Sequence, residues 1–260
     1  MDNHQSMNTR RQHIYVMREL TKREIKRKYA RSYLGILWSV LFPLLNMVVV
    51  SFIFSYIFSR NIDKYPVYYF TGYLIINFFS TATTTAMTAL KDNRNLMLKS
   101  KLPRSTFVLS RVYTALVNLG LSGIAYVVVL FVFRIQPSWT MFLIIPDIFF
   151  LTMFAVGVSY ALSIWFVFQE DSRNIYGIII SVLTTFAALF YSIDQLAPGV
   201  KTFIRFNPVY TYVHIARDCI MYGRISDPQY WIQMVAWGIG MYIVGRQIFK
   251  LQENRVMERL

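Results

Sequence analysis

The sequence has very few of the residues that build disulfides, metal centres and catalytic sites. Its 260 residues include one cysteine, Cys219, and three histidines, which excludes an internal disulfide and a multi-cysteine zinc site. The nearest approach to a phosphate-binding loop, Gly240 to Gly245, is followed by Arg246-Gln247 and lacks the Lys-Ser/Thr pair of that motif. HExxH and GxSxG motifs are absent as well. We therefore expect this chain to hold no catalytic residue, metal or cofactor, and not to hydrolyse ATP itself.

Charged residues are also scarce, at 15% of the chain against roughly 25% in an ordinary soluble domain. Hydrophobic types make up 55% and aromatics 17%, and the mean hydropathy is +0.40. A soluble globule of this size could not keep so much apolar surface out of water, and the same surplus excludes disorder. The composition therefore predicts an all-α polytopic membrane protein.

Six runs of the sequence are long and apolar enough to cross a bilayer, whose core of about 30 Å needs roughly 20 apolar residues in a helix. They cover about 36–58, 66–90, 112–133, 141–168, 175–193 and 230–249. Asp147, near the start of the fourth, is the one acid within these runs. An ion-coupled carrier would need more intramembrane charge, so we expect the energy source to lie outside this chain.

Basic residues are concentrated on one side of this predicted topology. Of the 27 Lys and Arg residues, 20 lie in segments on the side of the N-terminus and seven on the other. The positive-inside rule then places both termini in the cytoplasm and the chain in the cytoplasmic (inner) membrane as a multi-pass protein. Because the basic residues flank the spans, where they bind lipid headgroups, the net charge of +14 is not interpreted as nucleic-acid binding.

The predicted topology divides the chain into three regions. Residues 1–35 form a cytoplasmic N-terminal segment, 36–250 the six-helix transmembrane domain and 251–260 a cytoplasmic tail. Residues 14–33 contain no Gly or Pro and mix apolar with basic side chains. They predict an amphipathic helix lying in the cytoplasmic interface, with a simple topology anchor as the alternative.

Two segments between spans are longer and more apolar than minimal loops. In the cytoplasmic loop 91–111, Leu96, Met97 and Leu98 lie between basic residues. This pattern predicts docking of a cytosolic partner, and a solvated loop is the alternative. The outer segment 194–229 is punctuated by proline yet rich in apolar residues. It predicts two short re-entrant helices before the last span, with a hairpin on the outer surface as the alternative.

Three tyrosines at the outer end of the second run recur on one helical face: Tyr65, Tyr69 and Tyr73. Aromatic faces stack on sugar rings, and their hydroxyl groups form hydrogen bonds. An ordinary belt of interfacial tyrosines explains the same pattern. Both interpretations are open at the level of the sequence.

Three stretches of the sequence form a recognisable combination. The first contains Lys28, Tyr29, Leu34, Gly35, Trp38 and Pro43. The second, in the first cytoplasmic loop, contains Asn95, Leu96, Lys99, Lys101, Pro103 and Arg104. The third, before the last span, contains Asn207, Pro208, Tyr210 and Arg217. Together they resemble type-two ABC export permeases, and more narrowly those that export O-antigen, teichoic acid or capsule. Where that family often has Phe-Arg-Asp in its second cytoplasmic loop, this chain has Glu170, Asp171 and a displaced Arg173.

The resemblance implies a homodimer of six-span permeases with two copies of a separate nucleotide-binding ATPase subunit, which would bind ATP and Mg. The interfacial N-terminal helix and the loop around Leu96–Arg104 would contact that ATPase. A lipid-linked glycan would pass outward along Tyr65, Tyr69 and Tyr73. The outer segment, with Pro198 and the third stretch above, would act as a gate.

Three other functions remain open on the sequence alone. An ABC export permease for drugs or lipids would share most of these features. A membrane-embedded enzyme acting on lipid-linked glycans would need clustered acids or histidines near an interface, and only Asp92, Glu170 and Asp171 approach that on the inner side. A membrane scaffold would not need the patterned loop.

Overall fold

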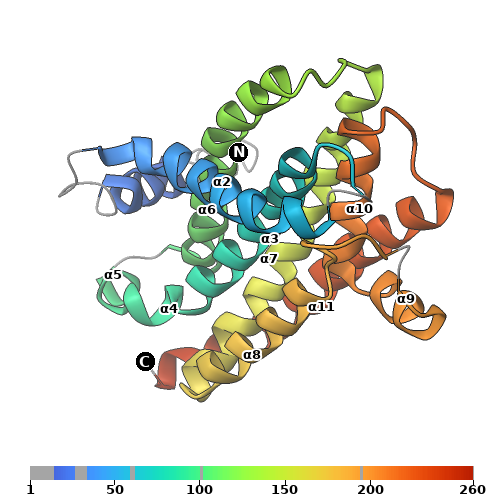
Figure 1. Cartoon of the computed structure of the whole chain (residues 1–260). Coiled ribbons are helices and arrows are strands. Elements are labelled where there is room, and N and C mark those ends of the chain that lie inside the picture. Colours follow the sequence, from blue (N-terminus) through green and yellow to red (C-terminus); the bar gives the residue numbers. More distant parts are fainter. Residues whose placement is uncertain (1–14, 27–33, 59–61, 100–101, 194–195, 260) are drawn as a thin grey trace, which may run out of the picture.

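The structure is a computed structural model that describes residues 15–26, 34–58, 62–99, 102–193 and 196–259. Within these ranges all regular secondary structure is helical, which confirms the predicted all-α class. A helix over 15–26 comes first. The elements after it are η1 (Gly35–Leu37), α2 (Trp38–Phe58), α3 (Tyr65–Met87), α4 (Ala89–Asp92), α5 (Arg94–Lys99), α6 (Ser105–Val132), η2 (Trp139–Leu143), α7 (Ile144–Phe168), α8 (Ser172–Thr185), α9 (Pro198–Arg205), α10 (Pro208–Ile220) and α11 (Pro228–Arg259) (Figure 1). The predicted residues Lys28, Tyr29 and Lys101 lie outside the described ranges.

Two helical segments in the described part of the chain are both long and apolar enough to cross a membrane. They are Ser105–Val132 and Trp139–Phe168, which correspond to the third and fourth predicted runs. A shorter apolar stretch covers Trp38–Phe54. The second and sixth runs form α3, with 23 residues, and α11, with 32. The count of six spans stays a prediction.

The centre of the molecule is α3, which packs against α2, α6, α7 and α10 (Figure 1). Most of its side chains are buried. Phe79 of α3 stacks on Phe154 of α7 with ring centroids 5.0 Å apart. On the other side of α7, the long helix α11 makes the most extensive helix pairing in the described structure. The core is therefore a layered bundle around α3 and α7.

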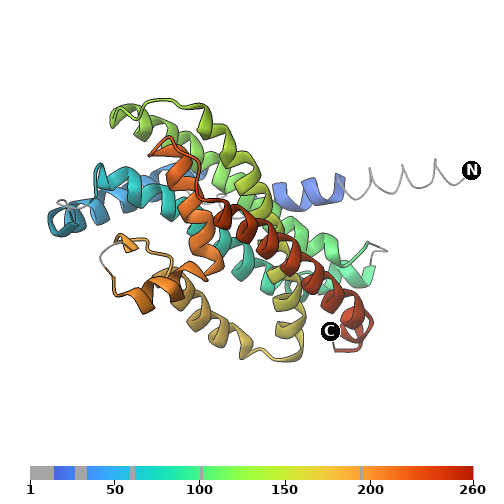
Figure 2. The same cartoon turned by 90° about the vertical axis from the view of Figure 1, so that its right-hand side faces the viewer.

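Glycine allows α7 and α11 to approach backbone to backbone. A Cβ atom built on Gly157 of α7 would overlap the main chain of Met241, and one built on Gly245 of α11 would overlap the main chain of Gly157. Figure 2 shows α11 (red) running across the bundle in this arrangement. Small residues at a crossing of two membrane helices permit this close packing, which is stabilised by van der Waals contact.

The fifth predicted run, 175–193, does not form one continuous helix. Its helix α8 ends at Thr185 and has 14 residues, which gives about 21 Å at 1.5 Å per residue. The hydroxyls of Thr184 and Thr185 hydrogen-bond back to the Ser181 carbonyl, and Ala188 has a φ of 52°. An alanine in the left-handed region ends a helix, although the run is apolar throughout.

The helix α8 packs lightly on the rest of the described structure. Only Ser172 and Tyr176 among its residues are buried, whereas Ile178 is 68% exposed and Val182 46%. In Figure 2, α8 (gold) runs along one edge of the molecule and α9 (orange) leads back toward α10. The prediction of two short helices before the last long one agrees with α9 and α10, while their depth in a membrane stays a prediction.

We predict that Gly157→Ala destabilises the bundle because its methyl group must displace the α11 backbone. Overpacking of this kind costs about 1–3 kcal/mol, which corresponds to a fall of roughly 5 °C in the unfolding midpoint for a chain of this size. The measurement is thermal unfolding of the detergent-solubilised protein. Gly120→Ala on α6 is the control, because no atom lies within 4 Å of its built Cβ. Equal midpoints for the two variants would contradict the assigned packing.

Candidate functional site

One face of α3 is polar along half of its length. Tyr73, Asn77, Ser80 and Thr84 follow each other at spacings of four, three and four residues, which places them on one side of a helix. All four are half-buried. The Thr84 hydroxyl donates to the Ser80 carbonyl at 2.6 Å, whereas the Asn77 side chain makes no hydrogen bond to any described residue. A bare carboxamide in hydrocarbon is costly, so this face must meet protein or water.

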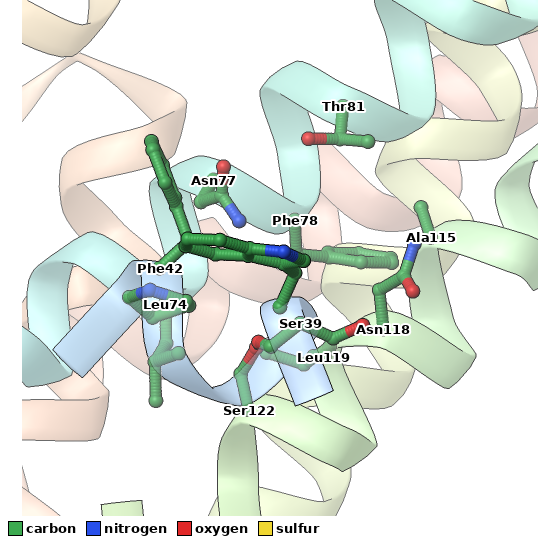
Figure 3. A pocket seen from close by; sticks show the side chains of 12 residues that line it. Ser39, Phe42, Leu74, Asn77, Phe78, Thr81, Ala115, Asn118, Leu119 and Ser122 are labelled. Atoms are coloured by element: carbon green, nitrogen blue, oxygen red, sulfur yellow. The ribbon is translucent and has the colours of Figure 1, made fainter. Parts of the chain in front are cut away.

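A cavity adjoins this face where proline interrupts the hydrogen bonding of α2. Pro43 has no N–H to donate to the carbonyl of Ser39 one turn earlier. The Ser122 hydroxyl of α6 donates to that carbonyl instead, at 2.9 Å. Beside this hydrogen bond is a cavity of about 420 Å³ between α2, α3 and α6 (Figure 3). Pro43 of the predicted signature therefore marks a place where α2 and α6 are joined.

The side chains around the cavity are aromatic or neutral and polar. Figure 3 shows Asn77 and Thr81 approaching it from α3, Asn118 from α6 and Phe42 from α2. The Asn118 side-chain oxygen is buried and has no hydrogen-bond partner among the described residues. None of the described residues that line the cavity is charged. Carboxamides, hydroxyls and ring faces without charge are groups that bind sugars reversibly.

The first signature also explains how the chain enters α2. Gly35 has a φ of +47°, a left-handed conformation that glycine adopts without steric cost. The Leu37 N–H then donates to the Leu34 carbonyl at 2.9 Å, which forms the short turn η1. Trp38 begins α2, is 41% exposed and lines the cavity.

The three predicted tyrosines are placed differently from one another. Tyr65 and Tyr69 are each 3% exposed. The Tyr65 hydroxyl donates to the Phe190 carbonyl at 3.1 Å, and the Tyr69 hydroxyl donates to the Asn46 side chain at 2.5 Å. Tyr73 is half-buried, begins the polar face and stacks on Tyr69 with centroids 5.8 Å apart. Tyr65 and Tyr69 thus join α3 to neighbouring segments, and a channel role for the three tyrosines stays a prediction.

Two predicted gate residues hold the chain that follows α8. The Asn207 side chain donates to the Leu183 carbonyl at 2.8 Å. The guanidinium of Arg217 donates to the carbonyls of Ala188 at 2.9 Å and Tyr68 at 3.3 Å. It also lies 3.5 Å from the centroid of the Tyr68 ring. We call these groups the outer anchor. The carbonyls of Leu183 and Ala188 lie at and just after the end of α8, which leaves them without helical donors, whereas the Tyr68 carbonyl belongs to α3.

The remaining gate residues form local structure. Pro198 begins α9 and Pro208 begins α10, positions where a missing N–H costs nothing. Asn207 caps α10 by accepting a hydrogen bond from the Val209 N–H at 3.0 Å. Tyr210 is 2% exposed and Arg217 4% exposed. In the described part of the chain no carboxylate lies within ion-pair distance of Arg217.

The opposite end of the bundle collects the N-terminal helix, both predicted cytoplasmic loops and the tail. Arg111 of α6 pairs with Glu24 at 2.7 Å and with Asp92 at 3.0 Å. In addition, Arg23 donates to the Asn93 side chain at 2.8 Å. Two further ion pairs connect this end, Lys91 with Glu170 and Arg104 with Glu253. We call this set the inner network.

The predicted docking residues lie on the exposed side of the inner network. Asn95, Leu96 and Lys99 are exposed on α5, and Pro103 and Arg104 are half-buried just before α6. Leu98 is 55% exposed, whereas Met97 is buried at 6%. Glu170, Asp171 and Arg173 are exposed at the turn between α7 and α8. Their contact with a partner stays a prediction.

The sequence analysis missed Asn77, Asn118 and Tyr68. A carboxamide inside an otherwise uncharged run was the signal available for the first two, because such a group needs a partner or water at membrane depth. Tyr68 had no comparable signal. Its neighbours at positions 65, 69 and 73 form the periodic face, while the contacts of Tyr68 with residues 188 and 191 depend on the tertiary fold.

Comparison with known proteins identifies the family. A family model described as ABC-2 type transporter matches residues 15–221. The chain belongs to the ABC-2 type transporter family. Two proteins named O-antigen export system permease protein RfbA, both from Klebsiella pneumoniae, are similar to it. They are 28% and 25% identical over 200 residues, which in each case is 76% of this chain and 77% of the relative.

Membership of this family makes the chain a membrane-embedded transporter subunit. The family match contains the polar face of α3, the cavity, the outer anchor and all but the tail of the inner network. A permease subunit of an ABC transporter is not itself the catalytic component, in agreement with the motifs that the sequence lacks.

We predict that Arg217→Gln loosens the chain between α8 and α9. The shorter amide cannot reach the carbonyls of the outer anchor, and each carbonyl left unpaired costs about 1–3 kcal/mol. Hydrogen exchange of the full chain in detergent should then be at least about tenfold faster in residues 183–191. Arg134→Gln, at an exposed position on the same end, is the charge-matched control. Unchanged exchange in the Arg217 variant would show that the outer anchor does not hold this segment.

Proposed function

We propose that this chain is the transmembrane permease subunit of an ATP-driven exporter that moves a lipid-linked polysaccharide of the O-antigen, teichoic acid or capsule type out across the cytoplasmic membrane. The observation that carries the proposal is the similarity to two O-antigen export permeases over 76% of the chain. The uncharged polar face of α3 supplies an independent physical argument.

A long hydrophilic polymer cannot cross hydrocarbon, because each polar group stripped of water costs several kcal/mol. The path must therefore be lined by groups that replace water. A moving chain also requires contacts that are numerous and individually weak. Asn77, Ser80, Thr81 and Thr84, with the ring of Tyr73, provide neutral donors, acceptors and an aromatic surface along α3. Strong ion pairs would hold the polymer instead of letting it slide.

A second copy of the chain would complete this path. The apolar side chains of α2 are widely exposed, with Val49 at 58% and Phe52 at 83%, and α8 exposes Ile178 and Val182. A homodimer about a two-fold axis that brings α2 and α8 of both copies together would enclose the polar faces. The remaining apolar surface would face lipid.

The energy would come from two copies of a nucleotide-binding ATPase subunit, which bind ATP and Mg. The inner network joins helix 15–26, α4, α6, the α7–α8 turn and the end of α11 at one end of the bundle. This arrangement supports a cytoplasmic side that carries both termini and both loops. Docking on α5 would move these elements together, because α5 directly follows α4 and ion pairs connect α4 with α6 and the α7–α8 turn.

An ABC export permease for lipids is the second candidate. It is favoured by an apolar groove of about 480 Å³ between α3, α6, α7 and α10, which includes Leu116, Val127 and Ile148. The tail of a transported lipid fits such a groove, but the tails of ordinary bilayer lipids fit it equally well. The polar face and the O-antigen relatives favour the polysaccharide.

We predict that combining Asn77→Leu with Thr81→Val lowers polysaccharide export by about tenfold or more, because two groups that replace water along the path are lost. The measurement is transport of the native lipid-linked polymer in vesicles that contain the permease and its ATPase. ATP hydrolysis by the complex should persist. Thr152→Val on α7 is the control, since its hydroxyl only bonds to the Ile148 carbonyl of its own helix. Full export by the double variant would exclude α3 from the path.

We predict that Leu98→Asp prevents the ATPase from copurifying with the permease, because a carboxylate disrupts an apolar docking surface. Leu251→Asp, at a position 78% exposed on α11, is the control for an exposed leucine outside the loop. Retention of the ATPase by both variants would remove α5 from the interface. Loss of the ATPase from both variants would mean that docking is not specific to the loop 91–111.

A further inference from the structure

A second polar cavity lies at the end of the bundle that carries the outer anchor. Its volume is about 490 Å³, within the range of small-molecule sites. It is formed by the start of α3, by α10, by the loop after α10 and by the start of α11. Unlike the cavity in Figure 3, it is lined by charged residues of both signs. We call it the outer cup.

Tyrosine rings form much of the buried wall of the outer cup. Tyr68, Tyr210 and Tyr230 are 5%, 2% and 6% exposed and come from three different helices. Tyr210 and Tyr230 meet edge to face with centroids 6.3 Å apart, and the His214 ring lies 4.1 Å from Tyr230. Packing from three helices fixes these ring positions. Because these rings are almost completely enclosed, they give the outer cup a rigid wall, and the Arg217 guanidinium covers the Tyr68 ring.

Asp218 and Arg224 in the wall of the cup form an ion pair, and both can still make further hydrogen bonds. Asp218 is 3% exposed, and one of its oxygens accepts from Arg224 Nε at 3.0 Å and lies 2.9 Å from Arg224 Nη2. The other oxygen lies 3.4 Å from His214 Nε2, a distance that leaves it able to accept a shorter bond. The hydrogen bond to Asp218 raises the pKa of the Arg224 guanidinium, whose side chain is 64% exposed.

This combination is selective for neighbouring hydroxyl groups. A carboxylate oxygen accepts from one hydroxyl, and the remaining guanidinium hydrogens donate to the next. An amphiphile would not match, because the cup is polar. A phosphate would match Arg205, Arg217 and Arg224 but would be repelled by Asp218 and Asp227, which also line the cup. Arg217, moreover, already donates to backbone carbonyls.

We propose that the outer cup is a binding subsite for one or two sugar units of a polysaccharide, held by hydrogen bonds between adjacent hydroxyls and the Asp218–Arg224 pair. This inference rests on the proposed function and adds to it a place where the polymer is held as it leaves. Because Arg217 and Asp218 are consecutive on α10, the cup and the outer anchor share one helix. A sugar in the cup contacts the helix that also holds the chain after α8.

The test measures binding of delipidated surface polysaccharide from the source cell, cut to short oligosaccharides, to the complete permease–ATPase complex in detergent. Titration calorimetry should give saturable binding to the wild-type complex. Arg224→Gln should weaken that binding by about tenfold, the effect of losing one charge-assisted hydrogen bond. Arg134→Gln, which changes the same charge outside the cup, should bind as the wild type does.

Two results would overturn the subsite. The first is equal affinity in the wild type and the Arg224 variant. The second is displacement of the oligosaccharide by millimolar inorganic phosphate, which would identify an anion site. An export assay with wild-type vesicles shows whether the subsite or the proposed function itself is wrong. If wild-type vesicles export the polymer and the cup does not bind it, only the subsite is wrong. If they export no polysaccharide, the proposed function is wrong.

Discussion

The structure depends on one constraint: within a membrane, polar backbone groups without a helical partner must find one in the protein. Among the described residues, the backbone hydrogen bonding of α2 is interrupted at Pro43 and that of α8 ends at Thr185, and side chains from elsewhere in the chain supply donors at both places. Pro43 frees the carbonyl of Ser39, and Ser122 donates to it. The end of α8 frees further carbonyls, and Asn207 and Arg217 donate to them. These hydrogen bonds join α2 to α6 and the end of α8 to α10.

The same constraint separates structural polar residues from candidates for transport. Tyr65, Tyr69 and Arg217 are buried and bonded within the chain, so they hold helices together. Asn77 and Asn118 face a cavity, and neither the Asn77 amide nor the Asn118 oxygen has a partner in the described residues. Polar groups that have no hydrogen-bond partner inside a membrane need water or a bound substrate to supply one. In a transporter, a hydrophilic substrate that passes the cavity would form these hydrogen bonds.

Much of the fold could be predicted from the sequence, and the contacts of the site could not. Apolar length predicted α6 and α7, and paired prolines predicted α9 and α10, because both signals are local. The carbonyls at the end of α8 are bound by Asn207 and Arg217, which are 24 and 29 residues farther along the sequence, and no local pattern indicates this pairing. The tyrosine periodicity identified a face of α3, but only packing shows that Tyr65 and Tyr69 are enclosed and Tyr73 is not.

Site-specific photocrosslinking tests the central claim most directly. A photoreactive phenylalanine analogue at position 77 should form adducts with the polysaccharide in vesicles that are exporting it, and these adducts should disappear without ATP. The same analogue at Val128, which is 58% exposed on α6, should react with lipid. Lipid adducts alone at position 77, under conditions in which polymer is being exported, would contradict the account.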